Sequence, residues 1–128
     1  MKYLGIDYGS KRIGLAVSDP NGSIAFPREV IVNKGKETLD YIATFCEREK
    51  IGAIVLGQSL NYKQEANPVQ SQISNFKFHI ESLTTVPVHY QSESLTSAEA
   101  SRNTNKANLD ASAAALILQA WLDKLTEP

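Results

Sequence analysis

Three acidic residues stand where a hydrolase that uses divalent metal ions needs carboxylates, at the ends of predicted elements. Asp7 follows the apolar stretch 3–6, Glu93 comes shortly after the stretch 87–90, and Asp110 begins an alanine-rich helical segment. Hydrolysis of a phosphodiester needs a neutralised phosphate, an activated water and a stabilised leaving oxygen, and divalent cations supply all three. Hard cations such as Mg²⁺ prefer carboxylate oxygens. The three acids therefore predict a metal-dependent phosphodiesterase, provided that folding brings them together.

Each acid also has a simpler interpretation when it is taken alone. Asp is common in turns, so Asp7 could only cap the turn that follows it. Glu93 could be a solvated loop residue, and Asp110 could be a helix-start residue favoured by the helix dipole. The metal-site interpretation depends on a predicted topology that places all three at one end of one sheet.

The elements that must position these acids follow from apolar patterns and turn residues. Strands are predicted at 3–7, 13–17, 24–32, 53–57 and 87–90, and helices at 37–50, 69–83, 95–101 and 109–125. Gly52 is expected to end the first helix, Pro27 indicates an edge strand or a bulge, and residues 102–108 are predicted to be a polar connection. The order indicates an α/β fold: a five-stranded mixed sheet, with an antiparallel meander of three strands, two parallel additions and helices on both faces.

Composition limits the classes of protein that this chain can represent. Its 128 residues indicate one domain, 1–128, and its 42% hydrophobic content allows a core but no membrane span. The net charge of −1 argues mildly against strong non-specific nucleic-acid binding. A lone cysteine, Cys46, and the lack of a signal-like start favour the cytoplasm.

Residues around the first acid are candidates for binding substrate. Gly9 would let a ligand approach the main chain closely, and Lys11 and Arg12 in the same turn could contact phosphates. Other basic residues expected near the site are Lys63, Arg102 and Lys106. The two histidines, His79 and His89, are expected to be packed or solvated more often than to be ligands. No histidine pair or cysteine cluster has the spacing of a zinc site, and no phosphate-binding G-x-x-x-x-G-K-[ST] motif occurs.

The sequence resembles the YqgF (RuvX) family over essentially its whole length. GIDYGSKRIGLAVSD is similar to the opening motif of that family, IVLGQSLN to its V-G-L-P-x-N segment, QSESLTSAEA to its D-E-R-L-T-T-x-E-A segment and NLDASAAALILQAWLD to its last helix. The resemblance implies an RNase H-like fold and a nuclease of structured nucleic acid, which either matures the 5′ end of the precursor of 16S rRNA or resolves Holliday junctions. It also implies Mg²⁺ or Mn²⁺, held by Asp7, Glu93 and Asp110. Symmetric cleavage of a junction would need two active sites and hence a homodimer.

Departures from the family pattern leave alternatives open. Ser92 and Ser94 replace the acidic and basic neighbours of Glu93, and an arginine there would be a natural phosphate contact. A catalytically impaired nucleic-acid-binding protein of ribosome assembly is therefore a second hypothesis. A third is a nucleotide-binding module, because G-x-D-x-G also resembles the phosphate-binding hairpin of sugar kinases and actin-like ATPases, although those proteins need a second similar domain.

Overall fold

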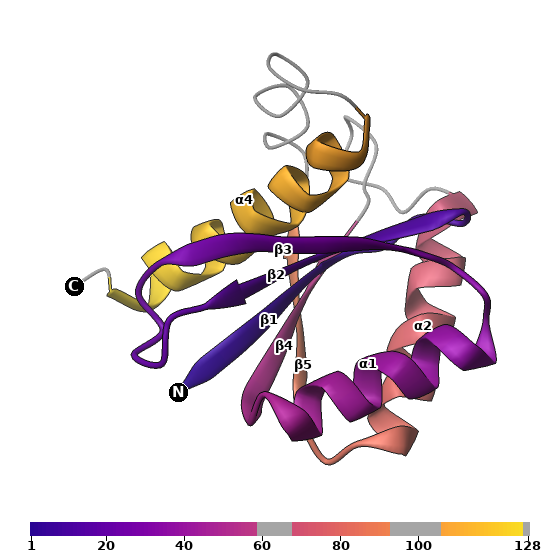
Figure 1. Cartoon of the computed structure of the whole chain (residues 1–128), viewed down its shortest axis with the longest axis horizontal. Helices are drawn as coiled ribbons and strands as arrows, with labels where there is room; N and C mark the ends of the chain where they lie inside the picture. The colour runs from indigo at the N-terminus through magenta and orange to yellow at the C-terminus, as the bar shows by residue number, and fades with distance from the viewer. Residues whose placement is uncertain (59–67, 93–105, 127–128) are drawn as a thin grey trace.

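The computed structural model describes residues 1–58, 68–92 and 106–126 of the chain (Figure 1). In chain order the elements are β1 (Lys2–Asp7), β2 (Arg12–Ser18), β3 (Ala25–Val32), α1 (Lys36–Arg48), β4 (Ile51–Gln58), α2 (Pro68–Leu83), β5 (Val88–Ser92) and α4 (Lys106–Thr126). The strands form one sheet in the order β3-β2-β1-β4-β5. The pairs β1–β2 and β2–β3 are antiparallel, and β1–β4 and β4–β5 are parallel. The predicted five-stranded mixed sheet is confirmed.

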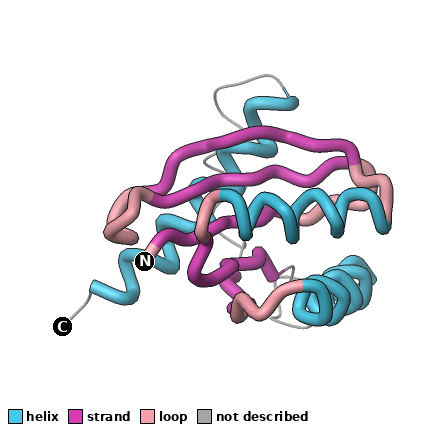
Figure 2. The backbone as a smooth tube through the Cα atoms, turned by 60° about the horizontal axis from the view of Figure 1, so that its bottom comes forward, coloured by secondary structure: helices cyan, strands magenta, loops and turns pink. Residues whose placement is uncertain are grey.

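Helices lie on both faces of the sheet, with α1 and α2 on one side and α4 on the other (Figures 1 and 2). Successive side chains of a strand point to opposite faces. In β1, Leu4 and Ile6 belong to the larger core beneath α1 and α2, while Tyr3 packs against the smaller core beneath α4. Gly5 and Asp7 share the face of Tyr3, so the first candidate acid is on the α4 side of the sheet.

Helix α4 approaches the sheet most closely at Gly5. A Cβ atom on Gly5 would lie 2.7 Å from Leu118 Cβ and 2.9 Å from the carbonyl oxygen of Ala114. Small residues on the buried side of the helix, Ala111 and Ala114 among them, permit this approach. Within the described part of the chain, no helix is long and apolar enough to cross a membrane.

Strand β3 forms one edge of the sheet, as Pro27 indicated. Its register against β2 shifts between Leu15 and Ala16, which pair with Glu29 and Pro27 respectively. The intervening Arg28 is therefore the extra residue of a bulge. The prediction of an edge strand or a bulge is confirmed, and β3 has both features.

The predicted end of α1 is wrong by a few residues. The helix ends at Arg48, Glu49 is its C-cap, and Lys50 adopts a left-handed conformation with φ of 56°. Gly52 lies inside β4 instead of ending the helix. The sequence suggested glycine because it is the residue that adopts left-handed backbone most readily, yet here a lysine makes the turn.

The start of the last helix also differs from its prediction. Helix α4 begins at Lys106, so the end of the predicted polar connection 102–108 is helical. Asp110 is consequently inside the helix, about one turn after its first residue, instead of opening it. The predicted helix 95–101 lies outside the described residues.

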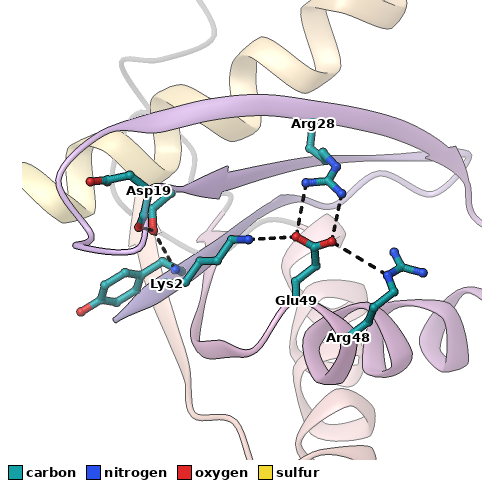
Figure 3. A network of polar contacts seen from close by, with 7 residues as sticks. Lys2, Asp19, Arg28, Arg48 and Glu49 are labelled. Carbon is teal, nitrogen blue, oxygen red and sulfur yellow. Dashed lines mark hydrogen bonds and ion pairs between the residues drawn. The ribbon is translucent and has the colours of Figure 1, made fainter.

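Glu49 links three elements at the end of the sheet where β1 begins (Figure 3). Its carboxylate contacts Lys2 Nζ at 2.9 Å and Arg28 Nη2 at 3.1 Å, while Arg48 Nε lies 3.9 Å away. The ion pairs with Lys2 and Arg28 hold the pKa of Glu49 below its usual value. This network joins β1, β3 and the end of α1 far from the edge that carries Asp7.

Candidate functional site

The carboxyl ends of three parallel strands meet at one edge of the sheet. These strands, β1, β4 and β5, end at Asp7, Gln58 and Ser92. Ligands of open α/β sheets bind at such an edge. Glu93 is the residue that follows Ser92 in the chain, and it lies outside the described residues. The edge is therefore the place to look for the predicted acids.

On each strand next to β1, the residue level with Asp7 is a glycine. Asp7 is paired directly with Gly14 of β2. Because Ile6 is paired with Leu56, Gly57 of β4 is level with Asp7 on the other side. The half-buried carboxylate therefore has a glycine on each flanking strand. Both glycines are buried, and neither has a side chain that would stand beside the carboxylate.

Gln91 continues this row across the sheet, because it is paired with Gly57. Its neighbour two residues earlier, His89, stacks on Trp121 of α4, so Gln91 shares the α4 face with Asp7. The Oε1 atom of Gln91 is buried and has no hydrogen-bond partner among the described residues. A buried acceptor normally has a donor, so a polar ligand or its bound water would satisfy this oxygen.

The residues of this row fit a divalent cation. The half-buried carboxylate of Asp7 and the unsatisfied amide oxygen of Gln91 are both oxygen ligands of the kind that Mg²⁺ and Mn²⁺ accept. Neither Gly14 nor Gly57 puts a side chain beside the Asp7 carboxylate. Among residues whose side chains are described, no group of three His, Cys, Asp or Glu could hold a metal. Glu93 and the side chain of Asp110 are outside that set.

The turn after Asp7 is fixed by Asn33, which follows β3. Asn33 Nδ2 donates to the carbonyl oxygen of Gly9 at 3.0 Å, and its backbone N–H donates to that of Lys11 at 2.8 Å. A Cβ atom on Gly9 would collide with the carbonyl oxygen of Arg12. Glycine is thus required by close packing inside the turn. The Lys11 side chain is exposed and Arg12 is half-buried.

Helix α4 brings Asp110 toward the same edge. Its later part lies at the end of the sheet where β1 begins. The Oε1 atom of Gln119 accepts a hydrogen bond from Ala25 N at 2.9 Å, and Ala25 pairs with Ser18, which binds Tyr3 N of β1. Ala114 lies over Gly5, two residues before Asp7. Asp110 is one helical turn before Ala114, so its backbone lies farther along β1, in the direction of Asp7. Lys106, the first residue of α4, is a further turn in that direction.

The remaining candidates divide into packed, exposed and undescribed residues. His89 is half-buried against Trp121, with ring centroids 4.7 Å apart, and His79 is exposed beside Phe78. Burial raises the pKa of the Cys46 thiol to about 11, which leaves it protonated and unreactive at neutral pH. Lys63 and Arg102 lie outside the described residues.

Sequence reasoning missed two residues of this edge. Gln91 was overlooked because the last strand was predicted to end at 90, and strand alternation carried two residues further would have placed it. Asn33 was assigned only to a turn. An Asn two residues before a Gly is a signal of a side chain that binds backbone, and Asn33 Oδ1 does accept from Gly35 N at 3.1 Å.

Comparisons with known proteins agree with this architecture. A protein from Maridesulfovibrio salexigens, provisionally named pre-16S rRNA nuclease, is 36% identical over 95% of this chain and 98% of its own. A relative from Gloeobacter violaceus with the same name is 40% identical over 94% of this chain and 82% of its own. RuvC from T. thermophilus, solved in complex with a Holliday junction substrate, superposes with a TM-score of 0.59 at 16% identity and covers 98% of this chain and 96% of its own.

The RuvC likeness shows the fold, which is the RNase H-like fold expected from the sequence. The family model for RuvX, described as Holliday junction resolvase, matches residues 1–124. With the motifs of the sequence, the sheet order and the relatives in agreement, the chain belongs to the RuvX family of nucleases, enzymes that act on phosphodiester bonds.

Proposed function

We propose that residues 1–128 form one nuclease domain that uses Mg²⁺ or Mn²⁺ to cleave structured nucleic acid, and that its natural substrate is the 5′ region of the precursor of 16S rRNA. The names of the relatives from Maridesulfovibrio salexigens and Gloeobacter violaceus support the RNA substrate. The description of the family supports branched DNA as the second substrate. Symmetric cleavage of a four-way junction would require a homodimer. A cytoplasmic location agrees with either substrate.

One observation carries this proposal: Asp7 ends the central parallel strand β1 with a glycine level with it on each neighbouring strand. A carboxylate that served only to cap a turn would not need flanking residues without side chains. A carboxylate that holds a hydrated cation would need them, because Mg²⁺ keeps several of its waters.

Asp7, Glu93 and Asp110 are the residues that we propose to hold the ion or ions. A bound divalent cation neutralises phosphate charge and makes a water more acidic. Asp7 comes from β1, Glu93 follows β5 and Asp110 belongs to α4. The three acids would therefore come together only when the helix is packed on the sheet. Gln91 Oε1 would accept a hydrogen bond from a water or a substrate hydroxyl at the same face.

The basic residues near this edge would bind the phosphates of the substrate. Lys11 is exposed on a turn whose backbone Asn33 fixes, so its charge is presented from a rigid support. Gly9 keeps that turn tight, and Arg12 begins β2 beside it. Lys106 at the start of α4, together with Arg102 before it, would contact the substrate from the other side.

A catalytically impaired nucleic-acid-binding protein is the alternative function. Ser92 ends β5 immediately before Glu93, at the position where the family pattern has an acid, and Ser94 stands where that pattern has an arginine. Loss of the arginine removes a bidentate phosphate contact. This alternative keeps binding of rRNA precursor and lacks hydrolysis.

Cleavage of a 16S rRNA precursor and a four-way DNA junction, side by side, separates these functions. Wild-type protein should cut the RNA with Mg²⁺ or Mn²⁺ and stop when a chelator is added, and Asp7→Asn should lose cleavage while it stays folded. Asp123→Asn, which changes an exposed acid near the end of α4, is the matched control. Calorimetric titration with Mn²⁺ adds a readout that does not need the substrate. Cation-independent cleavage, or full activity of Asp7→Asn, would refute the assignment.

A further inference from the structure

A pocket of about 230 Å³ opens on the side of the sheet edge opposite to the α4 face. Its lining includes Leu39 near the start of α1 and side chains between 72 and 79 of α2. These two helices share one side of the sheet (Figure 1). Tyr8 lines it, and Tyr8 is the residue that follows Asp7. The pocket and the proposed metal site therefore sit on the two sides of the same strand end.

The pocket combines apolar and aromatic walls with amide groups. Leu39 and Phe76 supply apolar surface, and the ring of Tyr8 lies 5.1 Å from that of Phe76 at 49°. Gln72, Asn75 and His79 line the pocket from the exposed surface of α2. Within the described part of the chain, the side chains of Gln72 and Asn75 make no hydrogen bond, so their amides are available to a ligand.

Among the described residues, no Lys, Arg, Asp or Glu borders the pocket. A phosphate site would be expected to carry a basic side chain. A planar, uncharged ligand that offers both donors and acceptors along its edge fits amides and aromatic rings better. Nucleobases have these properties, and proteins recognise unpaired bases by stacking and by hydrogen bonds to their edges.

We propose that this pocket receives one unpaired nucleobase of the substrate strand. The inference rests on the proposed function, because it takes the strand that is cut at Asp7 to continue over the sheet edge to Tyr8. Gln72 and Asn75 would bind the edge of the base, and Tyr8 with Phe76 would contact its face. The pocket would thereby select a substrate with an unpaired nucleotide next to the scissile phosphate.

The test measures binding without cleavage. The probe is a single-stranded RNA hexamer with 2-aminopurine at its centre, titrated with the whole chain in the presence of chelator. The double variant Gln72→Ala/Asn75→Ala changes two exposed residues, and its affinity should fall about tenfold because two net hydrogen bonds are lost. Asn21→Ala is the matched control, since it removes an exposed amide from the turn between β2 and β3. Adenosine should compete with the probe, and ribose 5-phosphate should not.

Three results would contradict the proposal that the pocket binds a nucleobase. They are no binding of the hexamer by wild-type protein, unchanged affinity of the double variant, or competition by ribose 5-phosphate and not by adenosine. The last would identify a phosphate site. Asp7→Asn separates this proposal from the proposed function, because it should abolish cleavage and leave hexamer binding intact. If the protein cleaved nothing but bound the hexamer through Gln72 and Asn75, the nuclease function would be refuted and the base-binding pocket would be supported. If cleavage depended on Asp7 but hexamer binding did not depend on Gln72 and Asn75, the nuclease function would be supported and the base-binding pocket would be refuted.

Discussion

Asp7 of β1 lies directly opposite Gly14 of β2 in the antiparallel pair. The Cβ atoms of residues in such positions are only about 4.5–5.5 Å apart, so any side chain on β2 at this point would stand beside the carboxylate. Glycine removes that neighbour. The pairing thus links the family's opening motif, which contains both residues, to the space that the proposed cation and its waters would need.

Gly14→Ala should therefore weaken Mn²⁺ binding by about tenfold or more, in the range known for changes around metal ligands. Cleavage should fall in parallel. The control is Gly52→Ala, a substitution inside β4 where the three atoms nearest to the added methyl group all belong to the Met1 side chain, which would have to shift. Calorimetry gives the metal affinity and cleavage assays give the rate for both variants. Equal metal affinity in Gly14→Ala and wild type would contradict the claim that a cation beside Asp7 needs glycine at position 14.

Asn33→Ala should loosen the turn that carries Gly9 and Lys11. The variant loses the hydrogen bond from Nδ2 to Gly9 O and the one that Oδ1 accepts from Gly35 N. Each is worth about 0.5–1.5 kcal/mol net, so the free energy of unfolding should drop by about 1–3 kcal/mol. Urea unfolding gives that value, and the KM for RNA should rise because Lys11 loses its support. If the stability fell while KM stayed constant, the turn would have no part in substrate binding.

The sheet could be predicted because its strands carry strong local signals. The apolar run of β4 indicated a strand covered on both faces, and Pro27 indicated the edge. Asp7 stood out because a carboxylate interrupts the apolar pattern at a strand end. These features depend on residues close together in the sequence.

Element ends and close contacts could not be predicted in the same way. Lys50 takes the left-handed conformation usual for glycine, because packing between α1 and β4 sets the chain direction there. The first turn of α4 is polar, so the apolar pattern predicted that the helix begins at 109, whereas it begins at Lys106. The contact of Gly5 with Leu118 joins residues more than a hundred positions apart, and only the folded sheet brings them together.

The turn after β2 gives a dependence of stability on pH. Asp19 accepts hydrogen bonds from the backbone N–H groups of Ile24 and Ser23, which lower its pKa from 3.8 to about 2. Between these values the unfolded chain binds more protons than the folded one, so stability falls as the pH is lowered through this range. Asp19→Asn should be less stable than wild type at pH 7 and should lose less stability between pH 4 and pH 2. Urea unfolding across this range checks it.

Cleavage at neutral pH should be unchanged in Asp19→Asn, because this turn lies at the end of the sheet opposite to Asp7. A pH dependence equal to that of wild type would show that other carboxylates dominate acid unfolding.

Gly5→Ala should disturb the site through the helix that carries Asp110. Its methyl group would meet Leu118 Cβ at 2.7 Å and the backbone oxygen of Ala114 at 2.9 Å, so α4 must move away from β1. Overpacking of this kind costs about 1–3 kcal/mol of stability. Mn²⁺ affinity and cleavage should both fall, whereas binding of the RNA hexamer in chelator should stay at the wild-type level, because the base pocket lies on the other face. A variant that lost stability but held Mn²⁺ as tightly as wild type would show that α4 contributes nothing to the metal site.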